Sequence, residues 1–106
     1  MEPRLIAVID LQTKYINERN AHVWESKYMS NNSTALFITD EAQQPLCKLS
    51  VNLEEYQVVP EEGRFYAKTY DENEGVMEAL IEAGIIKQIR FLNYRWTTYY
   101  ECEILA

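Results

Sequence analysis

The sequence contains few of the residues that define specialised protein classes. Two cysteines and one histidine occur among 106 residues, together with three glycines and three prolines. So little glycine and proline argues against a linker or a low-complexity chain. No stretch approaches the roughly 18 consecutive apolar residues that a membrane-spanning helix needs. These absences leave a globular protein as the expected class.

Basic residues are also scarce. Ten lysines and arginines stand against 17 aspartates and glutamates, which gives a formal net charge of −7 and a pI near 4.7. Because phosphate binding needs clustered lysine and arginine, nucleic acid is not an expected direct partner. The remaining composition, 47% apolar and 25% charged, is typical of a folded chain. Its length predicts a single domain over residues 1–106.

The two cysteines, Cys47 and Cys102, are predicted to be buried thiols. The start of the chain, Met1-Glu2-Pro3-Arg4, lacks the basic region typical of a signal peptide. We therefore expect a cytoplasmic, reducing compartment, in which structural disulfides are rare. The alternative is a small enzyme with a reactive thiol, since His22 could pair with either cysteine.

Alternating apolar and polar residues predict a mainly β chain. The expected strands are 5–11, 22–29, 34–39, 46–53, 65–70, 85–92 and 96–105. Apolar residues on both faces of strand 5–11 predict that it is covered on two sides. Residues 17–20 are predicted as the turn that follows it. In the last strand Thr97, Tyr99, Glu101 and Glu103 share a face that we expect to be the wetter one.

One helix is predicted over residues 73–83, with Asp71 or Asn73 as its cap. Val76, Met77, Leu80 and Ile81 provide one apolar stripe, and Gly84 stands where a left-handed residue ends a helix. The expected fold is therefore α+β: a twisted, mostly antiparallel sheet of about five to six strands with this helix packed on one face.

Several motifs occur together in the chain. Tyr28, Asn31 and Asn32 form a turn motif, Val51-Asn52-Leu53 ends a strand, and an acidic helix leads into Ala83-Gly84-Ile85 before an aromatic terminal strand. In this order they resemble a small family of uncharacterised bacterial proteins that phages and mobile elements often carry. The resemblance covers roughly residues 20–105, although the family's Gly-rich turn after the helix is missing here. It implies a genomic neighbourhood among phages and mobile elements, hence a host bacterial cell, and no particular reaction.

No catalytic motif is present in the sequence. It has no Gly-rich phosphate loop, no His-Glu-x-x-His and no Cys-x-x-Cys. Asp71-Glu72-Asn73-Glu74-Gly75 is similar to the start of a calcium loop, but its glycine comes one position early, and Val76 and Met77 stand where ligands are needed. We therefore expect a protein that is not an enzyme and that holds neither a cofactor nor a metal.

The acidic residues are concentrated in the middle of the chain. Residues 51–83 contain nine acidic and two basic residues, so this third of the sequence carries a charge equal to the net charge of the whole chain. Glu74, Glu78 and Glu82 are spaced four apart and would share one face of the predicted helix. The simplest interpretation is a solvated face that keeps the protein soluble. The alternative is an acidic surface presented to a basic partner.

The functional hypothesis follows from that second interpretation. It is a non-enzymatic, acidic protein-binding module of a phage or mobile element, such as an anti-CRISPR or anti-restriction inhibitor that mimics DNA and occupies a DNA-binding groove. The predicted partner-binding residues are Glu54, Glu55, Glu61, Glu62, Asp71, Glu72, Glu74, Glu78 and Glu82. The alternative is a structural or oligomerising accessory protein. Its predicted interface is the aromatic C-terminal hairpin, with Tyr94, Trp96, Tyr99 and Tyr100.

Overall fold

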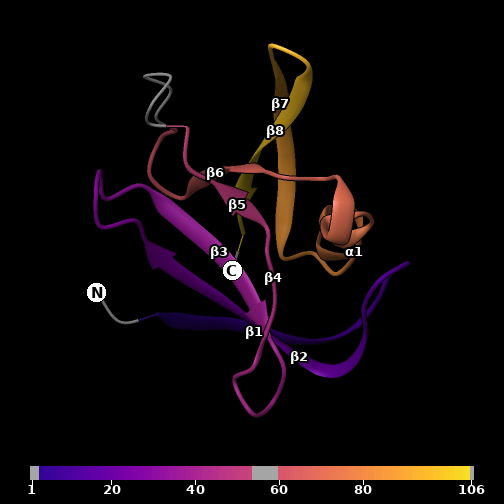
Figure 1. The fold of residues 1–106 in the computed structure, drawn as a ribbon. Coiled ribbons are helices and arrows are strands. Elements are labelled where there is room, and N and C mark those ends of the chain that lie inside the picture. The colour runs from indigo at the N-terminus through magenta and orange to yellow at the C-terminus, as the bar shows by residue number, and fades with distance from the viewer. Residues whose placement is uncertain (1–2, 54–59, 106) are drawn as a thin grey trace.

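The predicted strands fold into two antiparallel sheets. The computed structural model describes residues 3–53 and 60–105, and within them the chain forms two four-stranded sheets and one α-helix (Figure 1). The strand order is β1-β2-β3-β4 in the first sheet and β5-β6-β8-β7 in the second. The α+β class is confirmed, while the expected single sheet of about five to six strands is corrected to two sheets.

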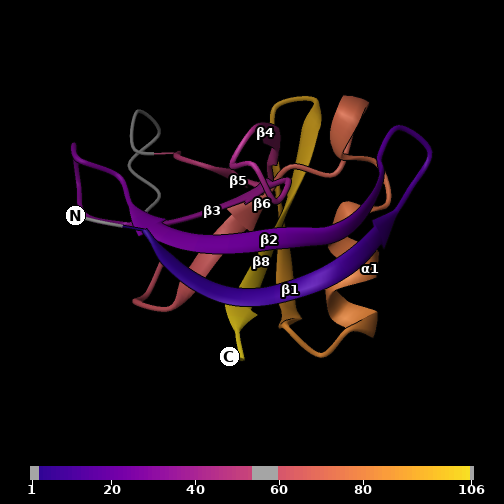
Figure 2. The same ribbon diagram turned by 90° about the horizontal axis from the view of Figure 1, so that it is seen from below.

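The first sheet begins with a long, curved hairpin (Figure 2). The sheet contains β1 (Arg4–Gln12), β2 (Asn17–Lys27), β3 (Thr34–Thr39) and β4 (Pro45–Lys48). The hairpin turns at residues 13–16, where the Thr13 N–H donates to the Ile16 carbonyl (2.7 Å) and Thr13 Oγ1 accepts from the Ile16 N–H (3.1 Å). The predicted turn at residues 17–20 is wrong, because Asn17 and Glu18 already pair with β1.

The expectation that the first strand is covered on two sides is also wrong. β1 lies at the edge of its sheet, and Leu5 and Val8 are 42% and 48% exposed. Only Leu11 in this strand is fully buried. Apolar residues on both faces of a strand therefore do not show here that both faces are covered.

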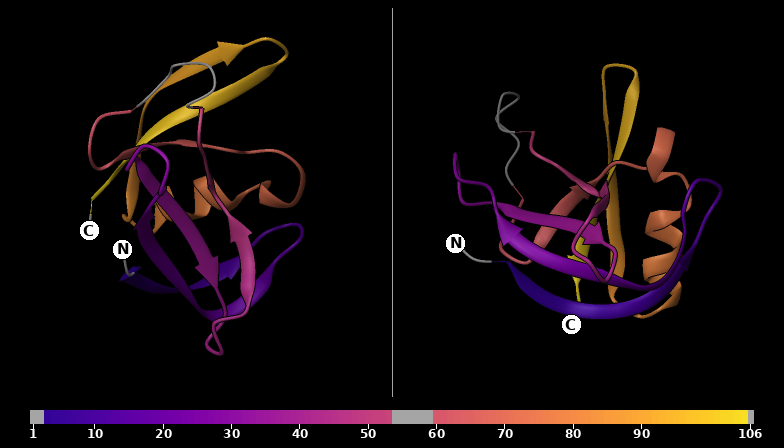
Figure 3. Two further views of the ribbon diagram at one scale, coloured as in Figure 1. Left: turned by 60° about the vertical axis from the view of Figure 1, so that its left-hand side comes forward. Right: turned by 60° about the horizontal axis from the view of Figure 1, so that its bottom comes forward.

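The second sheet ends in a hairpin that extends beyond its neighbours. It contains β5 (Ser50–Val51), β6 (Arg64–Ala67), β7 (Ile86–Tyr94) and β8 (Thr97–Ile104). The pairing of β6 with β8 stops at Ala67 and Tyr100, whereas β7 and β8 continue to pair up to Tyr94 and Thr97. The end of the β7–β8 hairpin therefore projects from the body of the molecule (Figures 1 and 3).

The chain passes from one sheet to the other at Leu49. The predicted strand 46–53 is divided there into β4 and β5, which belong to different sheets. The Leu49 N–H donates to Leu36 O (3.0 Å), and its carbonyl accepts from the Lys68 N–H (2.8 Å). The expected alternation holds up to Leu49 and then fails, since Cys47 and Leu49 are buried but beyond the break Ser50 is buried and Val51 is only half-buried. The N–H and the carbonyl of Leu49 are thus both hydrogen-bonded, one to each side of the point where the chain changes sheets.

A single buried cluster joins the two sheets and the helix. Its members include Val23, Leu36 and Ile38 from the first sheet, Phe65, Ile86 and Cys102 from the second, and Val76, Met77 and Leu80 from the helix. Most of these side chains are fully shielded from solvent. This burial is the main stabilising contribution to be expected in a chain of this size.

The predicted helix is interrupted near its start. A 3₁₀ turn, η2 (Asp71–Asn73), is separated by Gly75 (φ +87°) from α1 (Val76–Glu82). Gly84 has φ +76°, its N–H donates to Ile81 O, and the Ile85 N–H donates to Leu80 O (both 3.0 Å). These bonds form the left-handed cap that the sequence predicts. No helix in residues 3–53 and 60–105 is long and apolar enough to cross a membrane.

Candidate protein-binding surfaces

The predicted partner-binding residues do not lie on one surface. Asp71, Glu72, Glu74, Glu78 and Glu82 lie on η2, on α1 and between them, and we refer to these five as the acidic segment. Glu61 and Glu62 lie beside residues 31–34, and the segment before β6 that contains them runs on the side of the molecule away from α1 (Figures 1 and 2). Glu54 and Glu55 lie outside the described residues. The predicted continuous surface is therefore reduced to the acidic segment.

Packing of α1 determines which of these carboxylates face solvent. The helix buries Val76, Met77 and Leu80 against the core, so Glu78 and Glu82 lie on its exposed side. Glu74 precedes Gly75 and is not part of α1. The predicted row of three glutamates on one helix face is thus wrong, because the chain changes direction at Gly75. Only Glu78 and Glu82 keep the helical spacing of about 6 Å.

Two lysines offset part of the charge on the acidic segment. Lys68 Nζ lies 3.1 Å from Glu72 Oε1, and Lys14 Nζ lies 3.6 Å from Glu74 Oε2. A hydrogen bond from its own backbone N–H, followed by the bond from Lys68, lowers the pKa of Glu72. Within the described part of the chain Asp71, Glu78 and Glu82 make no ion pair. These three carboxylates are the ones that a basic partner could neutralise.

The basic residues of the second sheet pair with glutamates of the same sheet. Arg90 Nε donates to Glu101 Oε1 (2.6 Å), and Arg64 Nη1 lies 3.4 Å from Glu101 Oε2. Glu103 lies 3.4 Å from both Arg64 and Lys87. The Glu101 side chain is only 1% exposed, so the prediction that Glu101 lies on the wetter face is wrong. Arginines on both flanking strands compensate its charge. The alternation within a single strand cannot predict this burial, because the arginines belong to other strands.

The aromatic hairpin presents its largest side chain fully to solvent. Trp96 is 101% exposed and Phe91 59%, while Tyr99 and Tyr100 are half-buried. The side chain of Tyr94 is outside the described set. Between the hairpin and the chain leaving β6 lies a groove of about 380 Å³, lined by Thr69, Tyr70, Trp96, Thr97, Thr98 and Tyr100. Three of the four predicted hairpin aromatics are therefore accessible to a partner, at least in part.

Sequence reasoning missed a row of rings on the first sheet. The ring centroids of His22 and Trp24 are 6.2 Å apart, and those of Trp24 and Phe37 are 6.4 Å apart with 13° between the planes. Trp24 Nε1 donates to Thr39 Oγ1 (2.9 Å), which fixes the indole. The alternation of His22 and Trp24 along one strand was the available signal. Nothing in the sequence indicated that Phe37 would lie next to them.

The geometry does not bring His22 together with either cysteine. In the register of the first sheet, His22 pairs with Thr39 whereas Cys47 pairs with Ile38, so the two side chains point to opposite faces. Cys102 belongs to the other sheet. Burial raises the pKa of Cys47 to about 11 and that of Cys102 to about 12. A higher thiol pKa leaves little of the reactive thiolate at neutral pH.

Both thiols are therefore expected to resist alkylation in the folded protein. At pH 7 the thiolate fraction of Cys47 should be roughly 100-fold below that of an ordinary cysteine, and that of Cys102 lower still. Mass spectrometry after timed exposure to iodoacetamide, with and without denaturant, measures this. Rapid single labelling without denaturant would contradict the prediction and support a small enzyme with a reactive thiol.

Neither a search for metal-binding side chains nor comparison with known proteins assigns a function to these surfaces. Among residues 3–53 and 60–105, no group of three or more His, Cys, Asp and Glu side chains is arranged to hold a metal ion. Asn73 belongs to the segment that is similar to a calcium loop. Its side chain instead points inward, and its Nδ2 donates to Lys48 O (2.8 Å). In comparisons with known proteins, the chain matches no protein-family model, no curated protein and no solved structure.

Proposed function

We propose that this chain is a non-enzymatic module that binds a basic protein surface through the acidic segment. The observation that carries the proposal is the exposure of five carboxylates within twelve consecutive residues, of which Asp71, Glu78 and Glu82 have no ion-pair partner in the described chain. Unbalanced charge of one sign steers association with a surface of the opposite sign. The two sheets and α1 share one buried core, which supports this segment.

The proposed partner is a nucleic-acid-binding protein of the bacterial host. A groove that binds DNA is lined with cations spaced to meet one phosphate charge per roughly 3.4 Å of each strand. Glu78 and Glu82, about 6 Å apart along α1, offer negative charges at roughly half the linear density of one such strand. The module would then inhibit a defence nuclease, such as a CRISPR or restriction enzyme, from the cytoplasm of a cell that carries the phage or mobile element.

The test compares two double variants that remove the same charge from opposite sides of the molecule. We expect E78Q/E82Q to retain about tenfold less basic protein from a bacterial lysate than the wild-type chain, because the unpaired carboxylates are gone. E61Q/E62Q, the matched control, should behave like the wild type. Retained protein should be released by double-stranded DNA and by salt of about 0.3 M. Equal retention by both variants would contradict the proposal.

The alternative function, an oligomerising accessory protein, would use the aromatic hairpin. Full exposure of Trp96 is the observation that favours it, because exposed tryptophan is a frequent interface anchor. A net charge of −7 on each copy opposes self-association at low salt. Light scattering over a dilution series should therefore give the monomer mass at every concentration. A dimer mass that disappears in W96S would favour the accessory function.

A further inference from the structure

An open groove beside the aromatic hairpin lies outside the acidic segment. It lies where β6 ends. β6 pairs with β8 only from Tyr100 onward, so the first residues of β8, from Thr97, have no β6 neighbour. Trp96, fully exposed, and Tyr70, 41% exposed, contribute aromatic surface to the groove, as does Tyr100. Thr69, Thr97 and Thr98 complete the lining. The groove thus combines apolar surface with short polar side chains.

Three large apolar side chains are exposed around this part of the fold. Besides Tyr70 and Trp96, Phe91 is 59% exposed and contacts Tyr100, with ring centroids 6.5 Å apart. A two-stranded hairpin without further cover is only marginally stable in water. Exposed apolar side chains that gather in one place, rather than singly, mark interaction sites. We therefore expect a partner to cover this hairpin.

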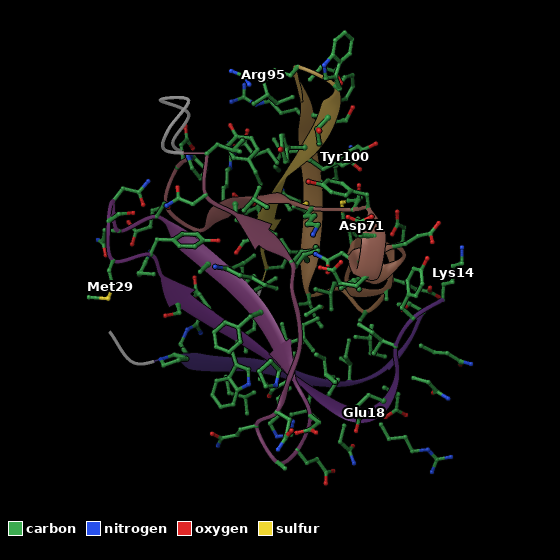
Figure 4. All side chains as sticks on the ribbon, in the orientation of Figure 1. Lys14, Glu18, Met29, Asp71, Arg95 and Tyr100 are labelled. Atoms are coloured by element: carbon green, nitrogen blue, oxygen red, sulfur yellow. The ribbon has the colours of Figure 1, made fainter. Side chains whose placement is uncertain are left out.

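Acidic residues follow one lining residue of the groove, Tyr70, in the chain, and Arg95 precedes another, Trp96. The chain passes from Tyr70 directly into Asp71 and Glu72, and Figure 4 shows Asp71 below Tyr100 of the hairpin. Lys68 already shows the chemistry available there: its Nζ lies 5.1 Å from the centre of the Tyr70 ring and 3.1 Å from Glu72 Oε1. Within the described residues Asp71 makes no salt bridge, although, after the hydrogen bond to Glu72, its charge helps to raise the pKa of Lys68. A cation from a partner could therefore still pair with Asp71.

The negative charge of the chain indicates which kind of molecule can occupy the groove. A second copy of the chain would bring a net charge of −7, with its own Asp71 and Glu72, toward this one, which is unfavourable. We propose that the groove binds a short segment of the partner protein in which a large apolar side chain adjoins a lysine or arginine. The apolar side chain packs against Trp96 and Tyr100, and the cation pairs with Asp71. This inference rests on the proposed function and adds a second, adjacent contact to it.

The direct test uses dye-labelled hexapeptides and fluorescence anisotropy. The probe alternates lysine and leucine; control peptides alternate lysine with serine, or glutamate with leucine. Only the lysine–leucine peptide should bind the wild-type chain measurably, and W96S and D71N should each weaken it about tenfold. V8S, which changes an exposed apolar residue of the first sheet, is the matched control and should bind like the wild type.

Each outcome bears on the inference separately from the proposed function. Unchanged binding in W96S, or no binding of the lysine–leucine peptide by the wild type, would overturn the groove proposal. Equal binding of the lysine–serine peptide would overturn the claim that the groove binds an apolar side chain. A dimer that is lost in W96S would show that a second copy of the chain occupies the groove. If E78Q/E82Q loses lysate retention while W96S keeps it, the proposed function stands and the groove does not. Circular dichroism confirms that the variants are folded.

Discussion

Leu80→Ala is expected to lower the free energy of unfolding by about 3 kcal/mol, within the range of roughly 2–5 kcal/mol for emptying a buried leucine site. Leu80 is completely buried and lies in the core that α1 shares with both sheets. The helix has only seven residues, too few to be stable without tertiary packing. Its position, and with it the display of Glu78 and Glu82, therefore depends on this contact.

Urea unfolding, followed by circular dichroism, measures the loss in Leu80→Ala. Ile81→Ala is the matched control, because the neighbouring Ile81 is 36% exposed and its truncation should cost about 1 kcal/mol or less. A Leu80→Ala variant as stable as Ile81→Ala would show that α1 is not docked on the core. The acidic segment would then have no fixed orientation.

Glu101→Ala should destabilise the protein by about 2–3 kcal/mol, since a buried hydrogen bond to a charged group contributes about 1.5–3 kcal/mol. Glu101 receives Arg90 on one carboxylate oxygen and Arg64 on the other, from the two strands that flank β8. Removing the carboxylate leaves both guanidinium groups without this partner and empties a buried position. The second sheet would lose its buried side-chain contact between β8 and the two flanking strands.

Glu103→Ala is the control for this change. Glu103 also pairs with Arg64, and with Lys87, but it is 32% exposed, and exposed pairs contribute little. Thermal unfolding of the two variants side by side should give a clearly larger drop in Tm for Glu101→Ala. Equal drops would mean that burial of Glu101 adds nothing to its ion pairs.

The sequence predicts the existence of the strands better than their grouping into sheets. Strand 34–39 and the buried helical residues Val76, Met77 and Leu80 are found where the periodicity places them, but Ile81, the fourth predicted member of the stripe, is 36% exposed. Leu49 is buried in the expected alternation, yet the chain changes sheets at this residue. Periodicity reports which side chains are buried. It does not report which strand provides the backbone hydrogen bonds, and this limits prediction of the architecture.

The turn at residues 17–20 shows a second limit. Asn17, Glu18, Arg19 and Asn20 form a polar run typical of a turn, but all four lie in β2, where Asn17 and Glu18 pair with Gln12 and Leu11 of β1. The actual turn depends on Thr13 Oγ1, which accepts from the Ile16 N–H. Together with the backbone bond from Thr13 N–H to Ile16 O, this contact places the turn before the polar run and not within it.

The candidate site could be predicted only in part for a related reason. Charge density along the sequence identifies the acidic segment, because its residues are close in the chain and stay close in space. It also groups Glu61 and Glu62 with them, although β6 and the chain that follows carry the backbone from one side of the molecule to the other. The groove at Trp96 forms because β6 is shorter than β8. A local sequence pattern cannot predict this difference in strand length.

The measurement that tests the central claim most directly is the dissociation constant of one captured basic partner. It should be determined for the wild type, for E78Q/E82Q and for E61Q/E62Q, at about 0.05 M and about 0.3 M salt. We predict that E78Q/E82Q binds about tenfold more weakly at low salt and that the difference narrows at high salt, while E61Q/E62Q binds like the wild type. An affinity that is the same for all three chains and insensitive to salt would contradict the claim that the acidic segment is the binding surface.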